Sequence, residues 1–265
     1  MSGRESVMEF KQSNIGEILE SECLMVLSAS ERFGYFYDNA MGTNYLLQHG
    51  VAGVPHHRSL FARWASQLKK YHLLALWSFV RLHQIQGLMN LRQVLEAAVD
   101  AAFALAHPDN IEDYAREDRR GALVTSKSLK NKRYAWLEAH YKGGSDSIKA
   151  LKDAINDYGS HGSVVQTMHN FRVELEGPEP FFGTSFFDAE DDYHVKTDLW
   201  RAANVGLCVL DLLYGVNRDF GVLTFSVDYV SRLQELIRQH EALGDEMRAT
   251  ERFQAAQLKV AAAQG

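Results

Sequence analysis

The chain has 265 residues, of which 46% are hydrophobic and 23% are charged, and its formal net charge is −6 at pH 7. This length and apolar content can bury one extended core, so we expect a single helical domain over residues 1–265. The negative charge excludes a general attraction to nucleic acid or anionic lipid, although a local basic patch remains compatible with either. Cys23 and Cys208 are far apart and lie in apolar helical patterns, which predicts buried reduced thiols and a cytoplasmic location.

Membrane insertion is not expected. The first fourteen residues contain no apolar run that would predict a secretory signal. The most lipid-like segment, residues 73–80, is far shorter than the roughly 20 residues needed to cross a bilayer. We therefore predict neither export nor a membrane span.

Helix is the dominant prediction for the first 107 residues, because proline occurs there only at Pro55. Ser13 or Asn14 can cap a first helix that runs to about residue 38. The segment around residues 42–50 is expected to be a short helical turn and a loop. A helical pattern then runs from Pro55 to residue 107, and we place a break in it near Gly87.

The most informative segment is QGLMNLRQVLEAAVDAAFALAH, residues 86–107. At about 100° per residue its polar side chains fall within an arc of roughly 100°, and apolar side chains cover the rest. Such a helix is expected at the centre of the protein. The polar arc holds Arg92, Gln93, Glu96, Asp100 and His107.

The middle of the chain predicts shorter elements. Residues 109–118 suggest a short helix, followed by a loop at 121–128 and a helix over 129–142 that Gly143 and Gly144 close. Ser145 is expected to cap the next helix, which loosens near Gly159 and Gly162. FRVELE at 171–176 alternates with period two and precedes a turn, so residues 171–187 predict a small β-arm or hairpin.

A second nearly all-apolar helix is predicted over residues 194–216, beside the first. Ser226 can cap a last long helix that runs to Gly244. Residues 245–265 are expected to form either a projecting C-terminal helix or a frayed tail. The predicted fold class is thus all-α: a multi-helix bundle with two central apolar helices and a small β-arm.

The polar arc has two interpretations. Arg92, Glu96 and Asp100 follow one another at four-residue spacing, so they can form a solvated stripe or a partly buried ion-pair network that orients neighbouring helices. Alternatively, they can line a cleft that binds a small polar ligand. Arg81 and Asp211 are isolated charges in apolar helices, and we expect each to find an opposite charge on a neighbouring helix because burying an unpaired charge is costly.

Histidine and carboxylate spacing gives no metal motif. Asp191, His194 and Asp198 share a helical face, but acids are also favoured in a first helical turn, where they cap the helix. The chain has no Glu-x-x-His pair, no His-Glu-x-x-His, no phosphate-binding glycine loop and no nucleophile elbow. We expect no metal and no cofactor.

A basic cluster is the best candidate for a nucleic-acid surface, because cations neutralise phosphates and nearby Tyr134 and Trp136 can stack on bases. The alternative is an ordinary exposed helix, since acidic residues dilute the charge. The candidate RNA-binding residues are Lys127, Lys130, Lys132 and Arg133.

The LRQVLEAAVDAAFALAH helix together with AINDYGSHGS resembles uncharacterised bacterial helical proteins of the HEPN-like group, over about residues 60–170. The resemblance implies RNA binding or cleavage by an Arg-Asn-x-x-x-x-His motif, often at a dimer interface. Asn156 and His161 match this motif as catalytic candidates, whereas Ile155 stands in the arginine position. A looser match runs from Arg133 to His140.

Three functions therefore stand as expectations. The first is a non-catalytic helical interaction or scaffold protein that forms a homodimer. The second is a HEPN-like protein that binds or cleaves RNA through Asn156 and His161. The third is a bundle that binds a small ligand or a metal at Arg92, Glu96 and Asp100.

Overall fold

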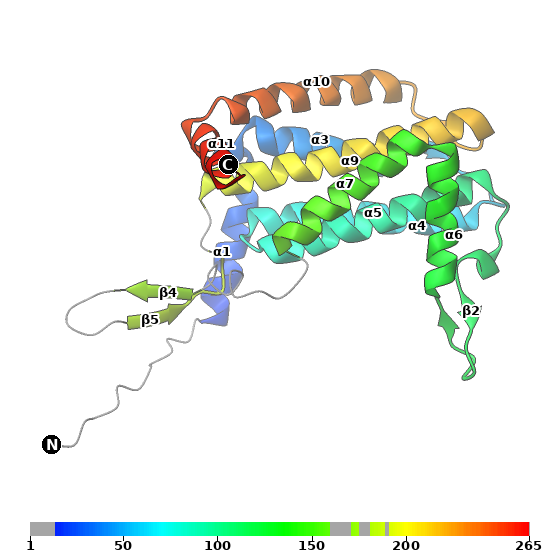
Figure 1. Cartoon of the computed structure of the whole chain (residues 1–265), viewed down its shortest axis with the longest axis horizontal. Coiled ribbons are helices and arrows are strands. Elements are labelled where there is room, and N and C mark those ends of the chain that lie inside the picture. Colours follow the sequence, from blue (N-terminus) through cyan, green and yellow to red (C-terminus); the bar gives the residue numbers. More distant parts are fainter. Residues whose placement is uncertain (1–13, 160–170, 175–180, 189–190, 265) are drawn as a thin grey trace.

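Three long helices form the centre of the protein: α4 (Ser59–Val80), α5 (Gln84–Ala106) and α9 (Asp192–Phe220) (Figure 1). The structure is a computed structural model, and it describes residues 14–159, 171–174, 181–188 and 191–264. Helix α5 packs along both α4 and α9. The described chain is thus an all-α bundle.

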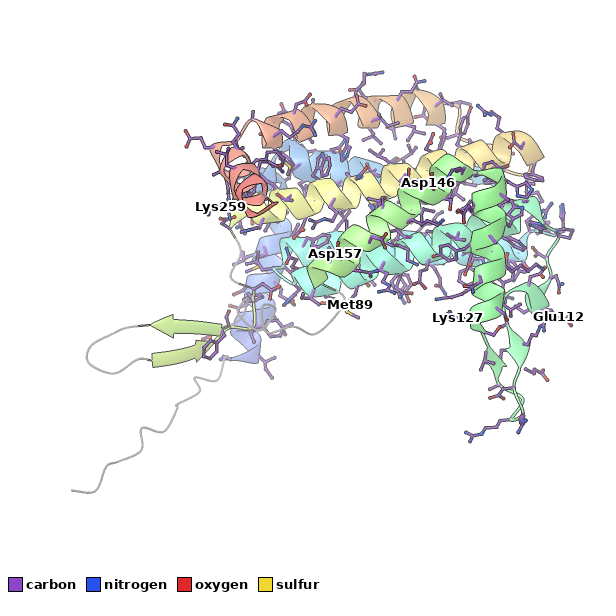
Figure 2. All side chains as sticks on the ribbon, in the orientation of Figure 1. Met89, Glu112, Lys127, Asp146, Asp157 and Lys259 are labelled. Carbon is purple, nitrogen blue, oxygen red and sulfur yellow. The ribbon has the colours of Figure 1, made fainter. Side chains whose placement is uncertain are left out.

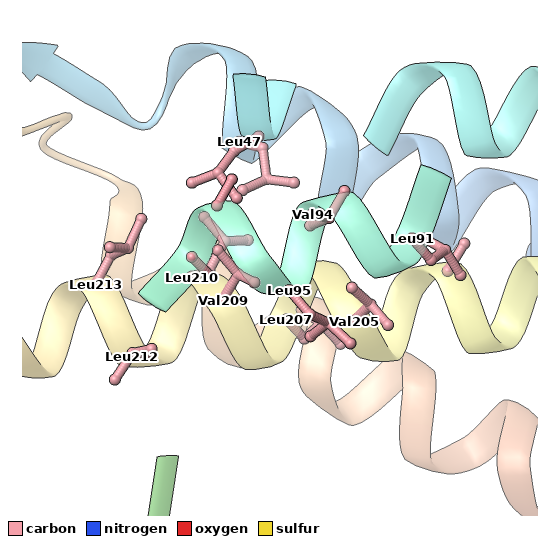
Figure 3. Close-up of a cluster of buried hydrophobic side chains, with 14 of the residues drawn as sticks. Leu47, Leu91, Val94, Leu95, Val205, Leu207, Val209, Leu210, Leu212 and Leu213 are labelled. Carbon is pink, nitrogen blue, oxygen red and sulfur yellow. The ribbon is translucent and has the colours of Figure 1, made fainter. Parts of the chain in front are cut away.

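The contact between α5 and α9 confirms that the two apolar helices are central. Leu91, Val94 and Leu95 of α5 are fully buried, as are Val205 and Val209 of α9. Figure 3 shows Leu95, Val205 and Val209 where the α5 and α9 ribbons meet, and Val94 on the side of α5 away from α9. Their periodicity predicts this placement because a helix that is apolar around most of its girth can be stable in water only when neighbours cover it.

The N-terminal helix is shorter than predicted. Helix α1 (Ile15–Leu27) is followed by α2 (Ala29–Phe33) and α3 (Tyr35–His49), so the prediction of one helix to residue 38 is wrong. Gly34 between α2 and α3 has φ +52°, which glycine adopts without the steric cost that a side chain brings. The cap of α1 is confirmed: the Asn14 side chain accepts a hydrogen bond from the Gly16 backbone N–H at 2.9 Å.

Several glycines lie inside helices rather than at breaks. Gly42 lies within α3, and Gly144 lies in the first turn of α7 (Lys142–Gly159), where neither ends a helix. Gly87 lies within α5, and the chain turns instead at Leu82, whose φ is +59°. A Cβ atom on Gly87 would lie 2.3 Å from the Phe79 ring, so this glycine allows α4 and α5 to approach closely.

The described chain also contains three antiparallel strand pairs at the edges of the bundle. The pair β1 (Val51–Gly53) and β6 (Thr224–Phe225) joins the chain after α3 to the chain after α9. The pair β2 (Arg116–Glu117) and β3 (Leu123–Val124) forms a projecting hairpin, where only a short helix and a loop were predicted. The pair β4 (Phe171–Glu174) and β5 (Phe181–Thr184) confirms the predicted arm, with Phe171 opposite Thr184.

Turn residues explain the β2–β3 hairpin. The Asp118 side chain accepts hydrogen bonds from the backbone N–H groups of Arg120 (2.8 Å) and Ala122 (3.0 Å). Gly121 has φ +74°. Aspartate followed by glycine at this spacing favours a tight turn over a helix, and the helical part is reduced to the 3₁₀ turn η1 (Ile111–Asp113).

Helix α6 (Lys127–His140) has the bounds that the pattern predicts to within two residues. Helix α10 (Tyr229–Arg248) begins three residues after Ser226, so the prediction that Ser226 caps this helix is wrong; the Ser226 backbone N–H donates to the Gly50 carbonyl beside the β1–β6 pair. Helix α11 (Glu251–Gln264) follows, and Arg252 forms an ion pair with Asp191 at the start of α9. The described part of the tail is therefore helical and tied to the bundle at its beginning.

One helix in the described chain, α9, is long and apolar enough to cross a membrane by length and composition. In its most apolar 18-residue window, 61% is buried inside the protein. This is the burial expected for a helix at the core of a bundle.

Candidate functional site

The polar arc of α5 faces α6 and α7. Glu96 lies 2.7 Å from Lys130 Nζ on α6 and 3.6 Å from Lys152 Nζ on α7. Arg92 Nε, one turn earlier, lies 3.5 Å from a Glu96 carboxylate oxygen. The arc is therefore a seam between helices rather than a stripe open to water.

The buried end of this polar seam is an ion pair between Arg133 and Asp100. The Arg133 side chain is 1% exposed, and its Nε and Nη2 atoms donate to the two Asp100 carboxylate oxygens at 2.5 and 3.3 Å. Its Nη1 donates to the Asp113 carbonyl at 2.7 Å. The contact restrains α6 against α5, because two hydrogen bonds between a planar guanidinium and a planar carboxylate limit how the two groups can rotate relative to each other.

The outer end of the seam reaches α7. Arg92 Nη1 donates to Asn156 Oδ1 at 2.7 Å, and Lys152 Nζ donates to the Tyr134 hydroxyl at 2.8 Å. Lys152 and Asn156 were not singled out together from the sequence, although their four-residue spacing places them on one face of α7. That spacing is the signal that could have identified them as partners of the arc.

The two carboxylates of the seam have opposite pKa shifts. Burial would raise the pKa of Glu96, but the Lys130 hydrogen bond and the charges of Lys152, Lys130 and Arg92 outweigh it and lower the pKa. Burial raises the pKa of Asp100, and Arg133 only partly opposes this. Burial and the nearby Glu96 and Asp100 raise the pKa of Tyr134 to about 12. Glu96 is thus a well-compensated anion, whereas the ion pair with Arg133 and the nearby charge of Lys130 do not fully offset the burial of Asp100.

The basic cluster predicted for RNA is largely occupied by these contacts. Lys130 pairs with Glu96, Lys132 Nζ pairs with Asp113 at 2.6 Å, and Arg133 is buried. Lys127 is exposed at the start of α6, next to the β2–β3 hairpin (Figure 2). The four residues therefore do not form one open cationic surface.

Only some of the candidate catalytic residues lie within the described part of the chain. Asn156 lies on α7 and contacts Arg92, whereas His161 lies outside the described residues. Arg133 and His140 are on the same helix, but Arg133 is buried against Asp100, and His140 is exposed with its Nδ1 atom 2.9 Å from the Trp136 carbonyl oxygen. The structure does not bring these two together at one surface.

Other sequence expectations have clear outcomes. Arg81 Nη1 lies 3.5 Å from Glu22 of α1, so its pairing across helices is confirmed. Asp211 is exposed on α9, so the premise that it is buried is wrong.

The two cysteines differ in burial. Cys208 is half-buried, whereas Cys23 is exposed on α1, which has no buried residue. The prediction of a buried thiol at Cys23 is therefore wrong.

The acidic start of α9 acts as a cap. The Asp191 side chain accepts a hydrogen bond from the His194 backbone N–H at 3.0 Å. Asp198 faces elsewhere: it is buried, pairs with Arg201 and accepts from Gln84 Nε2 at 2.8 Å. Within the described residues, no group of three histidine, cysteine or carboxylate side chains is arranged to hold a metal ion.

The fold and the site define an all-α bundle whose central helix carries an internally paired polar seam. Comparisons with protein-family models, curated proteins and solved structures gave no match to this chain.

Proposed function

We propose that this protein is a non-catalytic helical interaction protein that self-associates through α1. One observation carries the proposal: Ile15, Leu19, Cys23 and Leu27 form a row at four-residue spacing along one side of α1. Ile15, Leu19 and Leu27 are 75%, 59% and 76% exposed, and Cys23 is exposed. The polar seam supports the non-catalytic part, since its carboxylates are engaged by cations of α6 and α7.

Helix α1 gains little from its own bundle. It has no buried residue: Val26 packs only partly against the core, and Glu22 pairs with Arg81 and lies 3.1 Å from His83. A helix of 13 residues is marginal in water without an apolar face to bury. Covering the row would therefore stabilise α1.

The same row on the α1 helix of a second copy of the protein can pack against it. Side chains at i, i+4 and i+8 form a ridge, and two such ridges interdigitate when helices cross at about −50°. None of the four side chains of the row is charged, and Glu17 and Glu20 lie to one side of it on the helix surface.

Neighbouring aromatic side chains extend this apolar surface. The His83 ring lies 5.0 Å from the Phe186 ring, and Phe186 is 50% exposed. Figure 1 shows α1 beside the β4–β5 hairpin at one end of the bundle. The proposed interface is therefore at that end, away from the polar seam between α5 and α6.

Sedimentation equilibrium tests the proposal with two matched variants. Leu19→Glu places a charge in the row, and Leu24→Glu places the same charge at a position of α1 that is 66% exposed but outside the row. We expect the wild type and Leu24→Glu to dimerise and Leu19→Glu to be monomeric. A wild type that stays monomeric up to about 1 mM, or equal behaviour of the two variants, contradicts the proposal.

Cys23 supplies an independent measurement. Because it lies near the middle of the row, two copies crossing there bring the thiols within the roughly 7 Å between Cα atoms that a disulfide requires. Mild oxidation should cross-link the wild type and leave Cys23→Ser uncross-linked. In a cytoplasmic location, which the burial of α9 and the two free cysteines support, the thiol would stay reduced.

RNA cleavage of the HEPN type is a second candidate, favoured by the contact between Arg92 and Asn156. This contact puts an arginine from α5 beside the asparagine of the motif, where the sequence itself has Ile155. Incubation with labelled RNA tests it: Arg92→Ala and His161→Ala should both abolish cleavage. Absent cleavage, or cleavage that His161→Ala leaves unchanged, contradicts this candidate.

A further inference from the structure

A cavity of about 260 Å³ lies between α3, α4, α9 and the β1–β6 pair, and none of the seam residues lines it. Its wall is mainly apolar, with Leu47, Phe61, Leu210 and Leu213 among the lining side chains. The Tyr229 hydroxyl donates to the Leu210 carbonyl at 2.9 Å, so the tyrosine presents its ring. The cavity is suited to a hydrocarbon group.

Small side chains on α4 keep the cavity open. Ala62, Ala65, Ser66 and Lys69 line it from one face of the helix, at three- and four-residue spacing. Three of the four are alanine or serine. A larger apolar residue at Ala65 would fill part of the space, so the cavity follows directly from the sequence of α4.

Lys69 is the only charged residue among the described residues that line the cavity. Its Nζ donates to the Gln48 carbonyl at 2.8 Å, and within the described chain no carboxylate oxygen lies within 4.0 Å of it. An ammonium group has three donors, so further hydrogen bonds are available. Lys69 is half-buried, and this burial lowers the pKa of its ammonium group.

We propose that this cavity binds a medium-chain alkyl carboxylate, with the alkyl tail against α3 and α9 and the carboxylate on Lys69. A single anion compensates a single desolvated cation, which a neutral alcohol cannot do. Taking for each carbon atom the ~30 Å³ of one liquid water, the 260 Å³ space has room for roughly nine carbon atoms. A chain of about eight to ten carbons therefore matches its volume.

Isothermal titration calorimetry with decanoate tests this site. We expect decanoate to bind the wild type and 1-decanol to bind at least about tenfold more weakly, because the alcohol lacks the charge-assisted hydrogen bond to Lys69. Lys69→Met should lose affinity for decanoate by about the same factor. Lys70→Met is the matched control, since Lys70 is adjacent and exposed but does not line the cavity.

Two further variants separate the tail from the charge. Ala65→Phe should weaken decanoate binding by filling the cavity while Lys69 remains. Lys69→Gln repeats the loss of charge with a polar side chain in case Lys69→Met does not fold, and circular dichroism establishes folding. The proposal is overturned if the wild type does not bind decanoate, if 1-decanol binds as tightly, or if folded Lys69 variants keep full affinity.

Discussion

Replacing Arg133 with methionine removes the cation that joins α6 to α5. The side chain is 1% exposed and makes two contacts with Asp100 and one with the Asp113 carbonyl. Methionine keeps an apolar stem of similar shape. The variant therefore isolates the loss of the charge and its hydrogen bonds.

The expected cost is about 3 kcal/mol in the free energy of unfolding at neutral pH. Removing one partner of a buried ion pair typically costs about 3–5 kcal/mol, because the other charge stays buried. The lower end applies here, since the Asp100 side chain is 11% exposed and the charge of Lys130 remains near it. The loss is below a typical total stability of about 5–15 kcal/mol, so the variant should still fold.

Urea unfolding at two pH values gives a signature specific to this mechanism. Burial already raises the pKa of Asp100 against the opposition of Arg133, so Arg133→Met should raise it further. A carboxyl whose pKa is higher in the folded state stabilises the fold at low pH, and that stability is lost as pH rises through the folded-state pKa. The deficit of Arg133→Met should therefore shrink between neutral pH and about pH 5.

Lys132→Met is the matched control. Lys132 precedes Arg133 and pairs with Asp113, but its side chain is 55% exposed, so the expected loss is below about 1 kcal/mol. Asp100→Asn added to Arg133→Met should recover part of the stability, because the buried group is then neutral. Equal losses in Arg133→Met and Lys132→Met, or a deficit independent of pH, would refute the reasoning.

Burial of His72 lowers its pKa to about 4, so the folded state resists protonation. The free energy of unfolding should fall by up to about 3 kcal/mol as pH drops from about 6.5 to about 4, and His72→Gln should flatten this slope in urea titrations. Gly206→Ala should cost about 1–3 kcal/mol, because the new Cβ would lie 2.5 Å from Thr43 Cγ2 and 2.7 Å from His72 Nε2. Gly215→Ala on the same helix meets nothing within 4 Å and should stabilise by about 0.5–1 kcal/mol; thermal unfolding of both variants compares them.

Hydrophobic periodicity predicted the two central helices, because the share of a helix's circumference that is apolar can be determined from the sequence of that helix alone. Glycine was less informative. Gly42, Gly87 and Gly144 were interpreted as turns or breaks, yet each lies in a helix and faces a side chain of another helix at under 3 Å from an added Cβ. A single sequence does not distinguish a glycine that turns the chain from one that admits a neighbour, since the neighbour is distant along the chain.

The polar seam shows the same limit. The spacing of Arg92, Glu96 and Asp100 predicts a common face, and the structure confirms it. Which side chains cover that face depends on where α6 and α7 pack, and local patterns do not determine that. The basic cluster was consequently treated as a surface, although Arg133 is among the most deeply buried side chains of the described chain.

The place of α9 in the chain has a consequence for biosynthesis. Helix α9 packs against α3, α4, α5, α7 and α10, yet its first residue, Asp192, is made after most of those partners. On the ribosome, α4 and α5 can pack against each other early, but the apolar faces of α3, α4 and α5 that contact α9 stay uncovered until α9 is synthesised. A nascent chain that stops before Asp192 would expose the apolar faces that α9 covers in the folded protein. Chaperones and proteases would then reach these faces, so we expect the stable fold to form only after α9 has been translated.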